Sequence, residues 1–134
     1  MEPPSPPTRI LFVDDEPMIT RVGRRALVSL GYQPTIANDG AEAWELMQQE
    51  PLAFDLIISD QTMPGLTGLE LLDNVRKIHP DLPFILSTGY AENFDISDAL
   101  ARGAQAMLSK PFQLAELREI VERVLNSAHG PPGS

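Results

Sequence analysis

The apolar residues of this chain gather in short uninterrupted runs, separated by longer segments of mixed polarity. Residues 10–13, 56–58, 84–86 and 106–108 are apolar throughout. Such a run predicts a strand covered on both faces of a sheet, because a strand with one wet face would alternate polar and apolar side chains. We therefore expect strands at 10–13, 56–59, 83–87 and 106–109, with a weaker one at 34–37.

The segments between the runs predict helices over residues 16–30, 39–49, 68–78, 93–101 and 113–126, of which 93–101 has the poorest apolar stripe. Pro17 suits a first helical turn, where its missing N–H is not needed, and Gly31 suits a C-terminal stop. Apolar residues at helical spacing are expected to face the core. They are Ile19, Val22, Ala26, Leu27, Leu30, Ala43, Trp44, Met47, Leu69, Leu72, Val75, Ile78, Leu114, Leu117, Val121 and Val124.

The alternation of strands and helices predicts an α/β fold with a parallel sheet. Right-handed crossovers then favour a doubly wound, three-layer sandwich of the flavodoxin-like type. The common order for five strands is 2-1-3-4-5. In such sheets, binding sites form at the carboxyl edge where the order reverses, here between the first and third strands.

Length and composition limit the remaining choices. A chain of 134 residues predicts one domain, expected at 9–127, with a disordered Pro-rich arm at 1–8 and a disordered tail at 128–134. The net charge of −9 disfavours direct binding to nucleic acid or to anionic lipid. The chain has no cysteine and no apolar run of membrane-spanning length, so we expect a cytoplasmic location.

Four of the expected strands end at polar residues. Asp14 and Asp15 follow the first, Asp60 the third, Thr88 the fourth and Lys110 the fifth. Each has an ordinary structural explanation, such as a helix cap, a turn, a local hydroxyl bond or a solvated charge. However, all of them meet at one edge of the sheet, at the point where the strand order reverses. This convergence favours a functional site.

The chemistry of this cluster is constrained by its charges. Three nearby carboxylates repel one another, and a hard divalent cation such as Mg²⁺ removes the conflict by taking oxygen ligands. Lys110 could then bind a phosphate as a point charge, while the Thr88 hydroxyl donates to another phosphate oxygen. The set predicts Mg²⁺-dependent phosphoryl transfer to a carboxylate.

Four segments resemble the receiver domains of two-component response regulators. They are Phe-Val-Asp-Asp-Glu at 12–16, Ser-Asp-Gln-Thr-Met-Pro-Gly at 59–65, Ser-Thr-Gly at 87–89 and Ser-Lys-Pro-Phe at 109–112. The similarity covers residues 9–127. It implies that Asp60 is the phospho-acceptor, that Asp15 is the principal metal-binding acid, and that Asp14 assists through water. It also implies that the backbone carbonyl of Thr62 is a further metal ligand.

The same resemblance implies a switch. Thr88 corresponds to the switch hydroxyl and Lys110 to the phosphate-binding lysine, and the Lys110–Pro111 bond corresponds to one that is cis in the family. One position departs from the family: the aromatic switch residue of the fifth strand is replaced here by Met107. Tyr90 either overhangs the phosphate or is an ordinary loop aromatic.

The implied function is phosphorelay signalling. A histidine kinase or histidine phosphotransfer protein supplies the phosphoryl group, and the domain removes it by self-dephosphorylation, so the chain is not an enzyme in the usual sense. A downstream target is expected at the face formed by 93–101, 106–109 and 113–126, and a phosphorylation-dependent homodimer is compatible with it. The chain fits a stand-alone regulator or a module of a hybrid kinase.

Two alternatives remain at this stage. Asp60-Gln61-Thr62 also fits the nucleophile loop of a haloacid-dehalogenase phosphatase, although the chain is short for that class and Asp14 and Asp15 would have no role. A phosphorylation-independent binding module could keep the same fold, although the presence of every acid, the hydroxyl and the lysine argues against it.

Overall fold

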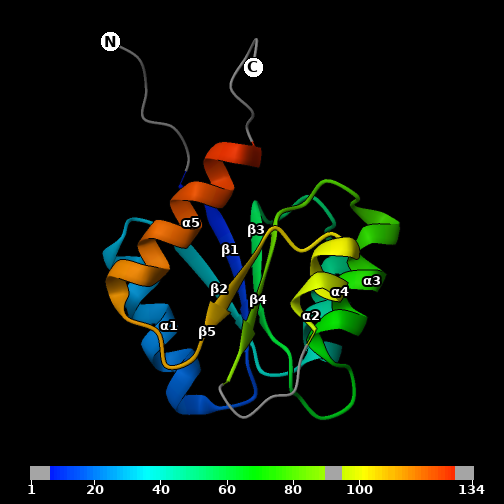
Figure 1. Cartoon of the computed structure of the whole chain (residues 1–134), viewed down its shortest axis with the longest axis horizontal. Coiled ribbons are helices and arrows are strands. Elements are labelled where there is room, and N and C mark those ends of the chain that lie inside the picture. The colour runs from blue at the N-terminus through cyan, green and yellow to red at the C-terminus, as the bar shows by residue number, and fades with distance from the viewer. Residues whose placement is uncertain (1–6, 90–94, 129–134) are drawn as a thin grey trace, which may run out of the picture.

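The five expected strands form one parallel sheet in the order β2-β1-β3-β4-β5, as predicted (Figure 1). The computed structural model describes residues 7–89 and 95–128. The strands are β1 (Arg9–Val13), β2 (Gln33–Ala37), β3 (Leu56–Asp60), β4 (Phe84–Thr88) and β5 (Ala106–Ser109). The order reverses between β1 and β3, whose carboxyl ends therefore lie side by side at the switch point.

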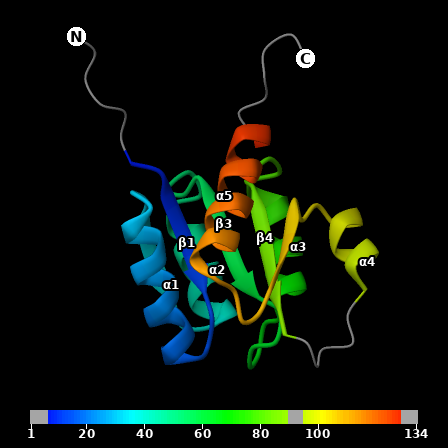
Figure 2. The same cartoon turned by 60° about the vertical axis from the view of Figure 1, so that its left-hand side comes forward.

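In the described part of the chain, five helices cover the two faces of the sheet and complete the doubly wound sandwich (Figure 2). They are α1 (Pro17–Ser29), α2 (Gly40–Gln49), α3 (Gly68–Ile78), α4 (Ile96–Ala101) and α5 (Leu114–Ala128). The predicted helix at 93–101 is described only from residue 95, because residues 93 and 94 lie outside the described ranges. α5 continues to Ala128, one residue past the expected domain limit. Within the described residues, no helix is both long enough and apolar enough to span a bilayer.

Alternate residues of each strand enter two separate cores. Leu11 and Val13 pack with side chains of α2 and α3 on one face, whereas Ile10 and Phe12 pack with side chains of α1 and α5 on the other. This division explains why the strands carry unbroken apolar runs, since both faces of the sheet are covered.

Three residues predicted to face the core do not do so. Val22 is 51% exposed, Leu114 is 50% exposed and Ile78 is 38% exposed. On α1 the sheet is met instead by the stripe of Thr20, Gly23 and Leu27. The core-facing stripes predicted from sequence were therefore too wide. Only the side chains on the part of a helix that lies nearest to the sheet are covered.

Local sequence explains where the helices begin and end. α1 starts with Pro17 and is followed by Gly31, which adopts a φ of 91°, so both predicted end signals are confirmed. The Asp39 side chain accepts from the Glu42 N–H at 2.8 Å and caps α2. Thr67 and Glu70 form a reciprocal capping box at the start of α3.

Gly23 allows α1 to approach the sheet closely, and this contact generates a prediction. A Cβ at this position would lie 2.5 Å from Cζ of the buried Phe12 ring. Gly23→Ala should therefore lower the free energy of unfolding by about 1–2 kcal/mol, because overpacking outweighs the gain of about 1 kcal/mol in helix propensity. Urea denaturation followed by circular dichroism measures the change.

The matched control is Val28→Ala, at an exposed position of the same helix. Its effect should stay within about 0.5 kcal/mol. A Gly23→Ala protein that is as stable as the wild type, or more stable, would contradict the close-packing argument.

Candidate functional site

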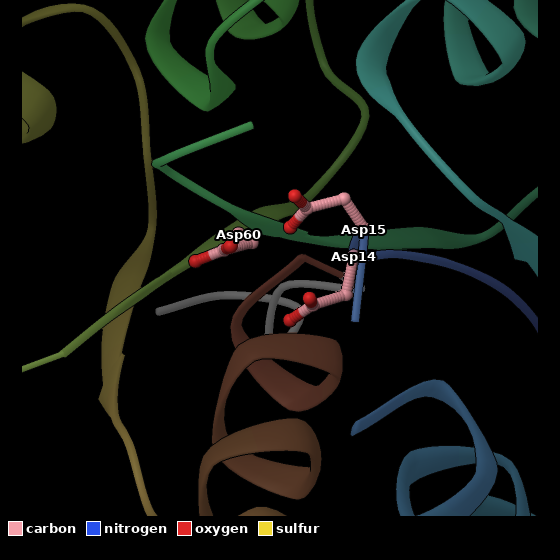
Figure 3. Close-up of side chains that lie close together, drawn as sticks. All are labelled: Asp14, Asp15 and Asp60. Carbon is pink, nitrogen blue, oxygen red and sulfur yellow. The ribbon is translucent and has the colours of Figure 1, made fainter. Parts of the chain in front are cut away.

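Three carboxylates lie together where β1 and β3 end. Asp14 directly follows β1, Asp60 is the last residue of β3, and Val13 pairs with Ser59 in the register of the two strands. One carboxylate oxygen from each of Asp14, Asp15 and Asp60 lies within 4.8 Å of the others (Figure 3). Asp14 is 1% exposed and Asp60 is 4% exposed, whereas Asp15 is open to solvent. The structure thus brings the three predicted acids into one cluster.

Lys110 reaches the cluster from the end of β5. Its Nζ lies 2.7 Å from Oδ2 of Asp14 and 3.2 Å from Oδ1 of Asp60. The Lys110 backbone N–H donates to the carbonyl of Thr88 at 2.8 Å, which fastens the residue to β4. The Lys110–Pro111 peptide bond is cis, as the family resemblance implied. A single ammonium group therefore bridges the two buried carboxylates.

The charges of the site do not cancel. Burial acts to lower the pKa of Lys110, but the hydrogen bond and charge of Asp14, together with those of Asp60, outweigh it and hold that pKa above its usual value. Lys110 is therefore fully protonated at neutral pH. One ammonium facing three carboxylates leaves two negative charges, and hard oxygen ligands with that charge fit a divalent cation such as Mg²⁺.

Asp14 also makes a local bond to the backbone ahead of α1, although it does not cap that helix. Its Oδ1 accepts from the Glu16 backbone N–H at 2.9 Å, just before the first turn of α1. Oδ2 of the same carboxylate contacts Lys110. Asp14 therefore does not cap α1, because its bond goes to the residue before the first helical position, but this local bond and the contact with Lys110 are compatible since each uses a different oxygen.

The predicted switch residues lie on the neighbouring strands. Thr88 ends β4 and is partly buried, one position beyond Ser87, the register partner of Asp60. Met107 pairs with Leu86 and packs against the core of α2 and α3. Because alternate strand residues share a face, Thr88 lies on the same side of the sheet as Leu86 and Met107. Tyr90, the other candidate near the phosphate, lies outside the described residues.

The segment that joins Asp60 to α3 holds the remaining candidate, Thr62. Thr62 is exposed and lies two residues after Asp60. Gly68 begins α3 directly against the end of β3, because a Cβ there would lie 2.5 Å from the backbone oxygen of Asp60. The sequence patterns did not predict this contact, nor the bond from the Leu69 N–H to the side chain of Gln61. A glycine at a helix start eight residues after Asp60 was the available signal.

Comparison with known proteins agrees with this architecture. Residues 10–122 match the model of the response regulator receiver domain. The chain belongs to this family. Family membership removes the phosphatase alternative, and the chain is a receiver domain of the two-component signalling type rather than a classical enzyme.

The relatives include proteins of different length. The chain is 37% identical to the response regulator receiver protein CpdR of Brucella abortus, covering 90% of this chain and 98% of that protein. It is 40% identical over 121 residues to the sensor kinase CckA of the same organism, covering 87% of this chain but only 12% of the kinase. The receiver domain is thus similar both to a protein of its own length and to a small part of a much longer one.

Solved structures give the same result. A response regulator receiver domain protein from Clostridium thermocellum superposes with a TM-score of 0.85 at 26% identity, covering 91% of this chain and 97% of that one. The receiver domain of the sensor histidine kinase PA1611 from Pseudomonas aeruginosa, solved with a magnesium ion in its active-site cleft, gives 0.80 at 31% identity, covering 90% and 98%.

The ion-pair geometry of Lys110 predicts a marked effect of its removal. In the presence of a chelator, Lys110→Met should lower the free energy of unfolding by about 3 kcal/mol, because it leaves the buried carboxylates of Asp14 and Asp60 without their cation. Because the two carboxylates raise the pKa of Lys110, its contribution is fully present at neutral pH, and the loss should shrink only when the pH rises far enough to deprotonate Lys110 in the wild type. Urea denaturation at neutral and alkaline pH measures both effects.

Lys77→Met provides the control, because Lys77 is exposed on α3 and its removal should change stability by no more than about 0.5 kcal/mol. Equal stability of the Lys110→Met and wild-type proteins at neutral pH would show that the ion pairs do not hold the site together.

Proposed function

We propose that Asp60 accepts a phosphoryl group from a phosphohistidine of a histidine kinase or phosphotransfer protein, with Mg²⁺ held at the cluster. The observation that carries this proposal is the cluster of three carboxylates at the switch point of the sheet, two of which share the partly buried ammonium group of Lys110. Asp15 and Asp60 would ligate the metal directly, Asp14 would act largely through water, and the Thr62 carbonyl would complete the protein ligands.

The proposed reaction uses the groups in these positions. An oxygen of the Asp60 carboxylate attacks phosphorus, the bond between phosphorus and the histidine nitrogen breaks, and the imidazole leaves with the bonding electron pair. When bound, Mg²⁺ would offset the negative charge that gathers on the carboxylates and the phosphoryl oxygens. Lys110 binds one phosphoryl oxygen as a point charge, and the Thr88 hydroxyl donates to another.

The same site would also end the signal. Water attacks the phosphorus of the acyl phosphate, the bond to Asp60 breaks, and inorganic phosphate leaves while the carboxylate is restored. The similarity to a sensor kinase and to a free-standing receiver protein supports a histidine-kinase donor for either arrangement of the chain. The domain limits at 9 and 127, the cytoplasmic location, the target face on α4, β5 and α5, and a phosphorylation-dependent homodimer stay predictions.

The acceptor role predicts a covalent adduct. Incubation with Mg²⁺ and a small acyl phosphate should add one phosphoryl group to the intact protein, measured by mass spectrometry. Asp60→Asn should abolish the adduct, because the amide is not a nucleophile for phosphorus, and a chelator should prevent it in the wild type.

Asp81→Asn is the matched control, since Asp81 is exposed and lies outside the acidic cluster. It should be phosphorylated like the wild type. A complete adduct on the Asp60→Asn protein would exclude Asp60 as the acceptor. An adduct that forms equally well without divalent cations would exclude the metal-dependent mechanism.

The proposed switch predicts unequal effects at Thr88 and Met107. Met107 is unbranched and adaptable, so it can fill the space that a moving Thr88 leaves but specifies one orientation poorly. The free energy that couples Asp60 to the surface of α4, β5 and α5 should be about 1–2 kcal/mol, with the active conformation partly populated before phosphorylation. Met107→Ala should therefore weaken the response less than Thr88→Ala.

Backbone amide shifts with and without beryllofluoride, a mimic of the phosphoryl group, measure this response. Val28→Ala, at an exposed position of α1, should leave it unchanged. If Met107→Ala removed the response of α4 and β5 while Thr88→Ala preserved it, the proposed order of importance would be wrong.

A further inference from the structure

Gln61, the residue after the proposed acceptor, is held at three points. Its backbone N–H donates to the carbonyl of Ser87 at 2.9 Å, and its carbonyl accepts from the Gly68 N–H at 3.0 Å. Its side-chain Oε1 accepts from the Leu69 N–H at 2.8 Å. One partly buried residue therefore joins the end of β3 to β4 and to the start of α3.

These bonds join the two ends of the loop between β3 and α3, because they link Gln61 to the first residues of α3. The first N–H groups of α3 have no partners within the helix, and Gln61 takes those of Gly68 and Leu69. Thr67 takes the next one, that of Glu70, through its hydroxyl at 3.2 Å. The side chain of Gln61 thus caps a helix that begins seven residues further along the chain, and it does so across the base of the loop that contains Thr62.

Thr62 follows Gln61 directly, so the peptide bond that leads into Thr62 begins at a residue held by three hydrogen bonds. On its other side Met63 is buried, with 6% exposure, which holds the segment a second time. Thr62 itself is exposed and lies between these two held neighbours. A backbone carbonyl is an effective metal ligand only when its direction is set by its surroundings.

We propose that Gln61 is a positioning residue for metal binding: its side-chain bond to Leu69 holds the loop so that the Thr62 carbonyl faces the acidic cluster. This inference rests on the proposed function, because it assumes that the cluster binds Mg²⁺. It assigns to Gln61 a role distinct from that of a helix cap. A cap that acted only on stability would leave the metal affinity of the folded protein unchanged.

The test compares Mg²⁺ affinities by isothermal titration calorimetry. Gln61→Met keeps the side-chain length but removes the acceptor for Leu69, and it should weaken Mg²⁺ binding roughly tenfold, as loss of a group that orients a ligand does. Gln61→Glu keeps an acceptor for the Leu69 N–H, so its Mg²⁺ affinity should stay within about threefold of the wild-type value. Amide exchange at Leu69 should be fast only in Gln61→Met.

Thr67→Ala is the matched control, because it removes a cap from the same end of α3 without touching Gln61. It should lower the melting temperature while changing Mg²⁺ affinity by less than about twofold. Asp15→Asn is the positive reference for loss of a direct ligand.

The outcomes separate the two proposals. Equal Mg²⁺ affinity of Gln61→Met and the wild type would overturn the role of Gln61 and leave the proposed function standing. Equal weakening by Gln61→Met and Thr67→Ala would also overturn it, because both would then act through the stability of α3. A wild type that does not bind Mg²⁺ would overturn both the inference and the metal-dependent function.

Discussion

Two buried carboxylates held by one ammonium group are the constraint on which the site depends. Asp14 and Asp60 are almost fully removed from water, which is costly unless each charge has a partner. Lys110 provides that partner for both. It can do so only because β1, β3 and β5 are parallel and deliver their carboxyl ends to one edge. The pairing of charges in the site therefore depends directly on the topology of the sheet.

Close packing and hydrogen bonds fix the positions of the helices and strands around this edge of the sheet. Gly68 brings the first residue of α3 against the backbone of Asp60, and Gln61 takes two N–H groups at the same helix end. Asp14 receives the Glu16 N–H ahead of α1 while it contacts Lys110 through its other oxygen. Folding thus places helix ends, which need hydrogen-bond partners, beside carboxylates and carbonyls that need fixed directions. The same bonds satisfy both requirements.

Sequence patterns predicted the sheet, its order and the convergence of the acids, because each depends on strand length and polarity along the chain. They did not predict which margin of a helix is covered. Gly23, rather than the apolar Val22 beside it, faces the Phe12 ring, and this depends on the distance between two elements. Leu71, which the predicted stripe of α3 omitted, is fully buried for the same reason. The hydrogen bond between Gln61 and Leu69 could not be predicted either. It joins the two ends of a loop, and the periodicity of apolar residues does not predict how a loop closes.

The two faces of the sheet have different parts in a switch of this kind. Asp60 lies two residues after Ile58 and so on the same face of the sheet, the one that packs against α1 and α5. Thr88 lies two residues after Leu86, on the face that packs against α2 and α3. The strand β4, which pairs with β3, connects the end of β3 at Asp60 to the second face.

On that face α4 is the helix with the weakest attachment: it has six residues, and Ala99 is its buried one. Arg102 links it to Asp73 of α3 through an exposed ion pair, which contributes little. Arg76 of α3, by contrast, donates to the carbonyls of Leu82 and Gly103 at 2.7 Å, so the turn after α4 is firmly held. The hydrogen bonds of Arg76 therefore fix the chain just after α4 more firmly than the exposed ion pair fixes the helix end.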